Sequence, residues 1–281
     1  MKRFDGEVLI GKRINKLKGY YGNVLEDFEM EEIHKFRLQI KKLRAFLRLI
    51  NKARRGTKKI KVNKYFLDFY RTIGHIRNLQ LHQKNVLEVC RNNNNELPKS
   101  YLECLHKQET ETKQLVRNMA STISIHNLNQ NIADALPLKI RRRSIAKFVA
   151  DKKASLISLL LTLPHSDTDL HSVRKILKDY LYTWVIIKHS VATNFQLNRV
   201  KQKEIKMIGE ELGNFQDCCL ALSFFKPECI RSAGKEVRTV RTLKFYFSRK
   251  KKLLKRKVTL LLVNLLRLIT NQTMLLPHEV H

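Results

Sequence analysis

The chain has 281 residues, and its 56 Lys and Arg outnumber its 25 Asp and Glu, so the formal net charge at pH 7 is +31. A hydrophobic content of 43% is ordinary for a folded domain and excludes a disordered basic tail. With 9 glycines and 5 prolines, the composition favours long helices and argues against an all-β fold.

Helical periodicity runs along the whole chain. Residues typical of turns interrupt it at Arg55–Thr57, Asn92–Asn95, Pro137 and Leu163–Asp169. In chain order, the expected helices cover residues 5–21, 28–51, 58–91, 98–126, 139–163, 168–193, 198–225 and 234–270. Eight helices of this length predict an all-α fold built from two four-helix bundles.

Each half of the chain contains one copy of the pattern H-x-x-R-x-x-x-K. The matched residues are His34, Arg37 and Lys41 in the first half and His171, Arg174 and Lys178 in the second. A glycine-containing segment follows each copy, with Gly74 at 40 positions after the first histidine and Gly213 at 42 positions after the second. The shared order and spacing predict an internal duplication within one domain over residues 1–281, with a first repeat over about 1–135 and a second over about 136–281.

The helix expected over residues 28–51 carries a stripe of cations. At about 100° per residue, five basic side chains fall within an arc of roughly 80°, beside an arc of apolar side chains. They are His34, Arg37, Lys41, Arg44 and Arg48. Like charges at i,i+4 disfavour a helix by a few tenths of a kcal/mol each, so we expect a bound anion to offset the repulsion. A solvated basic face remains the alternative.

The stripe in the second repeat is shorter. Leu181 and Val185 stand where the first repeat has Arg44 and Arg48, so the first half is expected to bind anions more strongly. Arg offers a planar fork that matches phosphate oxygens, while Lys supplies a compact charge, which favours a chain of phosphates. Other helices are expected to add cations, namely Lys12, Lys16, Arg77, Arg142, Lys251 and Lys255.

The segments that carry these residues resemble the CHAD family, the conserved histidine α-helical domain. They are Ile33–Ile50, Ile73–Gln80, Leu170–Trp184 and Leu212–Leu222. The resemblance implies two pseudo-symmetric four-helix bundles around a basic central groove or pore that binds inorganic polyphosphate. It also implies association with polyphosphate-metabolising enzymes or polyphosphate granules. Asn78 departs from the acidic residue that usually follows the arginine in the first half.

Catalytic chemistry is not expected. His34 and His171 have no acidic residue at i+3 or i+7, which favours ligand contact or structural hydrogen bonding over acid–base catalysis. Glu109–Lys113 matches the E-x-E-x-K signature of CYTH triphosphatases, but on the expected helix the two glutamates point about 160° apart. Phosphate-binding loops and metal-ligand motifs are also missing, so we predict no enzyme, no catalytic residue, no metal and no cofactor. A polyphosphate hydrolase is a third, less favoured hypothesis.

The remaining features concern location and the competing partner. Five cysteines without CxxC spacing, a start without an apolar leader and apolar stretches too short for a bilayer predict a cytoplasmic protein with no membrane span. An RNA- or DNA-binding protein is the main alternative, because charge alone does not separate polyphosphate from a nucleic-acid backbone. Against it, the stripe has no interleaved aromatic residues, and no known RNA-binding signature is present.

Overall fold

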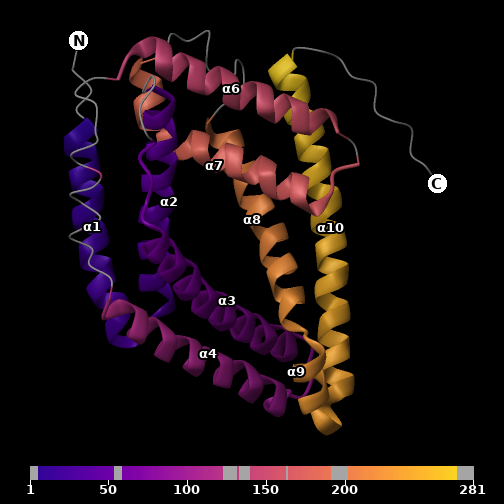
Figure 1. The fold of residues 1–281 in the computed structure, drawn as a ribbon. Coiled ribbons are helices and arrows are strands. Elements are labelled where there is room, and N and C mark those ends of the chain that lie inside the picture. The colour runs from indigo at the N-terminus through magenta and orange to yellow at the C-terminus, as the bar shows by residue number, and fades with distance from the viewer. Residues whose placement is uncertain are drawn as a thin grey trace. The chain divides into compact units, whose positions relative to one another are not determined.

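The computed structural model describes residues 6–53, 59–122, 132, 140–162, 164–190 and 202–270. Within these ranges the regular structure comprises nine α-helices, one 3₁₀ helix and no strand, which confirms the all-α prediction (Figure 1). The helices are α1 (Gly6–Asp27), α2 (Met30–Ala53), α3 (Lys64–Asn92), α4 (Lys99–Ala120), α6 (Arg142–Leu161), α7 (Asp167–Ser190), α8 (Gln202–Phe224), α9 (Pro227–Ser232), η2 (Gly234–Glu236) and α10 (Val237–Thr270). The turns predicted at Arg55–Thr57 and Pro137, and the helical positions expected at 5, 58, 123–126, 139, 163, 191–193 and 198–201, lie outside the described residues.

The chain divides into two compact units. The first unit is Met1–Ile140 with Asp217–Lys251, and the second is Arg141–Gln216 with Lys252–His281. The first long segment ends near the repeat boundary that the sequence predicts, but the first unit also includes a segment from the second half. Helices α8 and α10 therefore each contribute residues to both units. The duplication itself stays a prediction.

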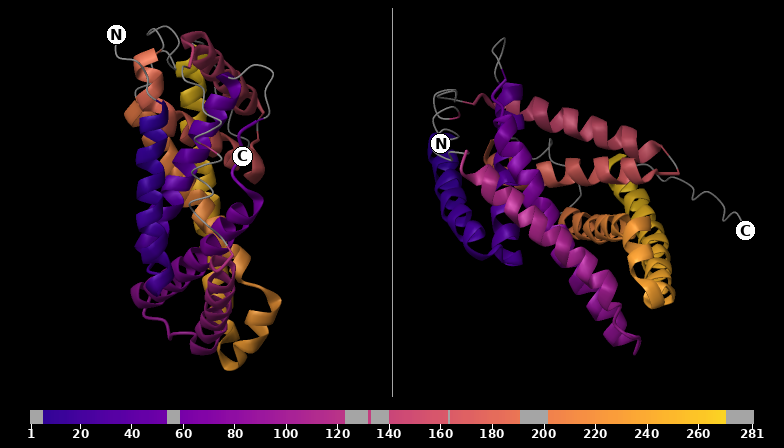
Figure 2. Two further views of the ribbon diagram at one scale, coloured as in Figure 1. Left: turned by 60° about the vertical axis from the view of Figure 1, so that its left-hand side comes forward. Right: turned by 60° about the horizontal axis from the view of Figure 1, so that its bottom comes forward.

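In the first unit, α1 and α2 lie side by side, joined by two residues (Figures 1 and 2). The first helix extends six residues beyond its predicted end, because Val24 continues the buried stripe of Ile14 and Leu17. Phe28 ends the segment with a φ of 58°, a conformation that L-residues rarely adopt. Its side chain is buried, so packing holds this turn in place.

Helix α3 joins this pair through an aromatic cluster. Phe36, Phe66 and Phe69 pack with ring centroids 6.2 to 6.3 Å apart, and Tyr21 lies 5.3 Å from Phe69. The helix begins at Lys64, later than predicted, because the side chain of Asn63 accepts a hydrogen bond from the backbone N–H of Tyr65 and caps it.

A second core of the first unit lies where α3 and α4 meet the segment 217–251. Tyr101 is fully buried, shares a 2.8 Å hydrogen bond with His82 and stacks on Phe225 at 5.5 Å. The short helix α9 and the 3₁₀ turn η2 were not predicted from the sequence. Pro227 starts α9, and Gly234 makes the turn into α10 with a φ of 51°.

In the second unit, α6 and α7 lie side by side (Figures 1 and 2). Apolar side chains of α6, α7, α8 and α10 are buried, and ion pairs connect these helices. The Nζ–Oδ2 distance between Lys152 and Asp179 is 2.8 Å, and Asp179 is only 5% exposed. On α10, Lys255 contacts Asp167 at 2.9 Å and Lys257 contacts Glu211 at 2.8 Å.

Candidate anion-binding site

The cationic stripe lies along the edge of the buried face of α2. The buried apolar residues of this helix include the five of the arc beside the stripe, namely Ile33, Phe36, Ile40, Leu43 and Leu47. Next to them, the side chains of His34, Arg37, Lys41 and Arg44 are partly buried, whereas Arg48 is exposed. Most of the stripe is therefore partly buried and is not a fully solvated face. Its partly buried side chains lose part of their hydration.

Arg37 lies directly against α3. Its Nη1 donates a 2.9 Å hydrogen bond to the carbonyl oxygen of Tyr70, and its guanidinium lies 4.6 Å from the centroid of the Tyr70 ring. A Cβ atom at Gly74 would overlap the guanidinium, so only glycine permits this approach. Arg44 lies 6.0 Å from the same ring. Tyr70 and Gly74 thus form the surface that positions the stripe.

The charge of Arg37 has no carboxylate partner among the residues that the structure describes. Burial lowers the pKa of Arg37, which nonetheless stays cationic. Burial and then the charges of Arg77, Lys41 and Arg37 lower the pKa of His34, with a partial offset from Glu31. This lowered pKa favours the neutral form of His34 at pH 7. A half-buried cation without a counterion is costly, and a bound anion would remove that cost.

In the second unit the matching arginine also faces the matching glycine, but the two lie further apart. The position of a Cβ at Gly213 would lie 3.9 Å from Nη2 of Arg174, so this arginine faces the glycine as Arg37 faces Gly74. Lys178 lies beside Gly209, with its Nζ 3.7 Å from where a Cβ would stand. Burial and the charge of Arg174 lower the pKa of Lys178, while Glu210 partly offsets them.

The second cluster differs from the first at two positions, and one of the differences removes a positive charge. Nδ1 of His171 and Oε1 of Gln216 share a 2.9 Å hydrogen bond, whereas the equivalent neighbour of His34 is Arg77. With the amide oxygen as acceptor, Nδ1 of His171 carries the proton. At the place of the Tyr70 ring, the second unit has Gly209.

The other predicted cations are distributed between the units. Lys16 lies near Lys42, whose pKa is lowered by burial and then by Arg13 and Lys16. Lys42 is about 100° around α2 from Lys41, so the structure does not bring Lys16 to the stripe. Lys12 and Arg142 are exposed, Lys251 is partly buried, and Lys255 is paired with Asp167.

Two residues of the clusters were missed in the sequence. Tyr70 is one helical turn before Gly74 and therefore on the same face, but nothing in its spacing marks it as a partner of an arginine. Gln216 follows Gly213 by three positions, the spacing that separates Gly74 from Arg77. Gln216 lies inside the matched segment Leu212–Leu222, but its uncharged side chain did not mark it as a site residue.

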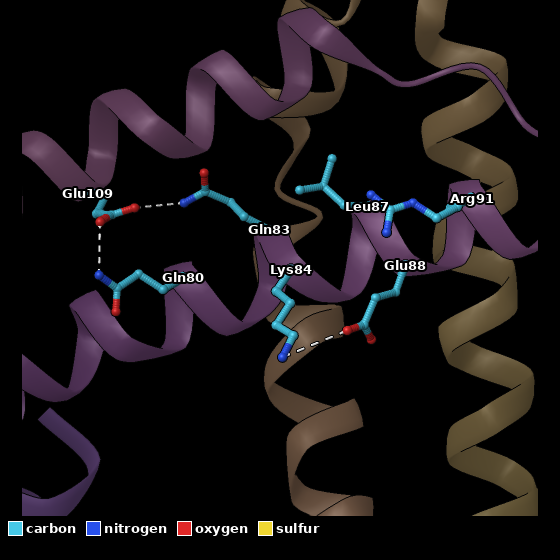
Figure 3. Close-up of a pocket in the computed structure, with 7 residues that line it drawn as sticks. All are labelled: Gln80, Gln83, Lys84, Leu87, Glu88, Arg91 and Glu109. Atoms are coloured by element: carbon cyan, nitrogen blue, oxygen red, sulfur yellow. Dashed lines mark hydrogen bonds and ion pairs between the residues drawn. The ribbon is translucent and has the colours of Figure 1, made fainter. Parts of the chain in front are cut away.

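A separate hollow of about 400 Å³ lies between α3 and α4 (Figure 3). Its lining includes Glu109, which accepts hydrogen bonds from Gln80 at 3.1 Å and Gln83 at 2.8 Å. Lys113 lies 2.6 Å from the same carboxylate, and Glu111 points to solvent. Burial raises the pKa of Glu109, but these hydrogen bonds outweigh it and hold the pKa below its usual value. The E-x-E-x-K match therefore anchors two helices, and the hollow is a poor site for a polyanion.

The described part of the chain holds no cluster of three or more histidine, cysteine or acidic side chains able to bind a metal ion. Over the same residues, no helix combines the length and the apolar character needed to cross a bilayer.

Known proteins resemble this chain in sequence pattern and in fold. A family model described as the CHAD domain matches residues 8–226. The structure is similar to the crystal structure of the CHAD domain from the plant Ricinus communis, with a TM-score of 0.73 at 14% identity over 94% of each chain. At that identity the likeness shows the fold alone. The search of curated proteins returned no match.

Proposed function

The chain belongs to the CHAD family, and from this premise we propose that it binds inorganic polyphosphate without catalysing a reaction. The ligand lies along the stripe of α2, and the matching residues of α7 form a weaker second contact. Capture is electrostatic, since the clusters present cations and hydrogen-bond donors and lack the carboxylate pair that a phosphohydrolase needs to hold Mg²⁺.

The observation that carries this proposal is the position of Arg37. It is partly buried, fixed to α3 and without a carboxylate partner among the described residues. A phosphate oxygen would supply the missing charge through the free edge of the guanidinium fork. From His34 to Arg48 the stripe is about 21 Å long at 1.5 Å per residue, which suits a linear, repeating anion more than a single phosphate.

We further propose that the two clusters derive from a duplication and line a basic central groove or pore. Arg37 facing Gly74 and Arg174 facing Gly213 support the duplication, because in each unit the arginine of the H-x-x-R pattern faces the glycine of the segment that follows it. A protein that captures polyphosphate in this way would serve in polyphosphate granules or as a scaffold for polyphosphate-metabolising enzymes in the cytoplasm.

Charge reversal of the stripe tests the proposal. In R37E/K41E, binding of long-chain polyphosphate should fall at least about 100-fold, because two attractive contacts become repulsive. The control is K61E/K64E, which changes the net charge equally at two exposed residues of the same unit. Titration calorimetry at several salt concentrations measures both. Equal losses in the two variants would mean that the stripe contributes only to the overall positive potential of the protein and is not a specific binding site.

The relative strength of the two clusters is a second test. Because Gln216 and Gly209 replace Arg77 and Tyr70, R174A should weaken polyphosphate binding less than R37A does. A larger effect of R174A would assign the main contact to the second unit.

A further inference from the structure

The exposed face of α10 carries aromatic side chains as well as cations, and in this it differs from the α2 stripe. This 34-residue helix contains no acidic residue and lies beyond residues 8–226, which the family model matches. In its first half, within the first unit, Phe245 is 63% exposed and Tyr246 is 37% exposed. Single exposed hydrophobic residues are common on protein surfaces, whereas neighbouring exposed aromatic residues form a patch that is typical of an interaction surface.

Each exposed ring has a cation one turn further along. Cζ of Arg249 lies 5.9 Å from the centroid of Phe245, and Nζ of Lys250 lies 5.9 Å from that of Tyr246. Arg241 is exposed one turn before Phe245. Residues four apart are neighbours on a helix surface, so the face alternates cations and aromatic rings along its length.

Such a face fits a ligand that has both phosphates and flat apolar groups. Bases stack on aromatic side chains while Arg and Lys contact the backbone, and this works for single strands of any sequence. Polyphosphate has no group that could cover Phe245 or Tyr246. The α2 stripe differs, since its aromatic neighbour Tyr70 is buried and contacts the arginines from the protein side.

An anionic membrane surface fits less well. Helices that lie in a membrane interface separate an apolar face from a basic one. On α10 the two kinds of side chain share one face, with Arg249 midway between Phe245 and the exposed Leu253. Inserting the apolar side chains would draw the guanidinium toward the acyl region.

We propose that this face of α10 binds single-stranded nucleic acid, with Phe245 and Tyr246 stacking on bases and Arg241, Arg249 and Lys250 holding phosphates. This activity goes beyond polyphosphate binding and does not depend on it, because it uses another helix and another kind of contact.

The test separates bases from phosphates. Fluorescence anisotropy compares an oligouridine with an abasic strand of the same length, which carries the same phosphates, at one salt concentration. F245A/Y246A should weaken oligouridine binding about 10-fold or more and change abasic binding less than about 2-fold. The matched control is Y65A/L115A, which removes two other exposed large side chains of the first unit and should leave both affinities unchanged.

Three results would overturn the proposal. The first is equal binding of both strands by the wild-type protein, and the second is an equal weakening of both in F245A/Y246A. The third is loss of binding to phosphatidylserine-containing vesicles in F245A/Y246A without any base preference, which would assign the face to lipid. Thermal melting checks that the variants fold. Polyphosphate binding, measured in parallel, should be intact in F245A/Y246A, and a failure of the R37E/K41E prediction would leave the base-dependent result standing.

Discussion

Substituting the glycine opposite Arg37 separates the position of that arginine from its charge. In Gly74→Ala the net charge is unchanged, but the new methyl group occupies the place of the guanidinium, which has to move away from α3. Gly213→Ala is the matched control, because the methyl group there would lie at 3.9 Å from Arg174, an ordinary contact distance. Both positions are inside helices.

The magnitudes follow from the contacts. Replacing a helical glycine by alanine stabilises a helix by about 1 kcal/mol, so G213A should be more stable than the wild type by up to that amount. G74A receives the same gain but loses a hydrogen bond from a charged donor, worth about 1.5 to 3 kcal/mol, and a cation–π contact, worth about 0.5 to 2 kcal/mol. The net result should be a destabilisation of about 1 to 4 kcal/mol.

Urea unfolding followed by circular dichroism measures the stability of both variants, and calorimetry measures their affinity for polyphosphate. We expect a gap of about 2 kcal/mol or more between G213A and G74A, with weaker polyphosphate binding only in G74A. If G74A is as stable as G213A and binds equally well, Arg37 is not held by α3 and the reasoning about its position is wrong.

Three further predictions concern buried polar groups. Burial lowers the pKa of His82 to about 4, so on acidification the histidine is protonated in the unfolded chain before it is protonated in the folded protein. The neutral, buried histidine therefore contributes about 3 kcal/mol to the free energy of unfolding above pH 6.5, and this contribution is lost as the pH falls to about 4. Urea unfolding of H82F across this range should show a flatter pH dependence, and an unchanged slope would contradict the assignment. D179N should lower the free energy of unfolding by about 2 kcal/mol or more, because Lys152 loses the charge of its buried partner; a change under about 0.5 kcal/mol would mean that the pair contributes nothing. E109Q should lower the free energy of unfolding by about 1 to 3 kcal/mol, whereas E111Q should change it by less than about 0.5 kcal/mol. If thermal or urea unfolding shows the larger loss for E111Q, the buried carboxylate is that of Glu111.

The helices themselves were largely predictable. Apolar spacing of 3 and 4 residues marks a helix wherever it occurs, and α2, α6 and α7 agree with their predicted ranges within three residues at each described end. The predicted end of α1 at residue 21 was wrong, because the buried Val24 continues the apolar stripe of this helix. The six-residue α9 was missed because so short a segment has too few residues to show a period.

By itself, the sequence determined which residues share a helix face: His34, Arg37, Lys41, Arg44 and Arg48 form a stripe on any α-helix because the spacing is local. It also determined that Gly74 and Gly213 occupy matching places. Only the tertiary structure decided that Gly74 accommodates a guanidinium, that Lys16 lies near Lys42 and that His171 contacts Gln216. The physical reason is that contacts between helices depend on how whole surfaces pack, and this is set by side chains distant in the chain and not by the period of one helix.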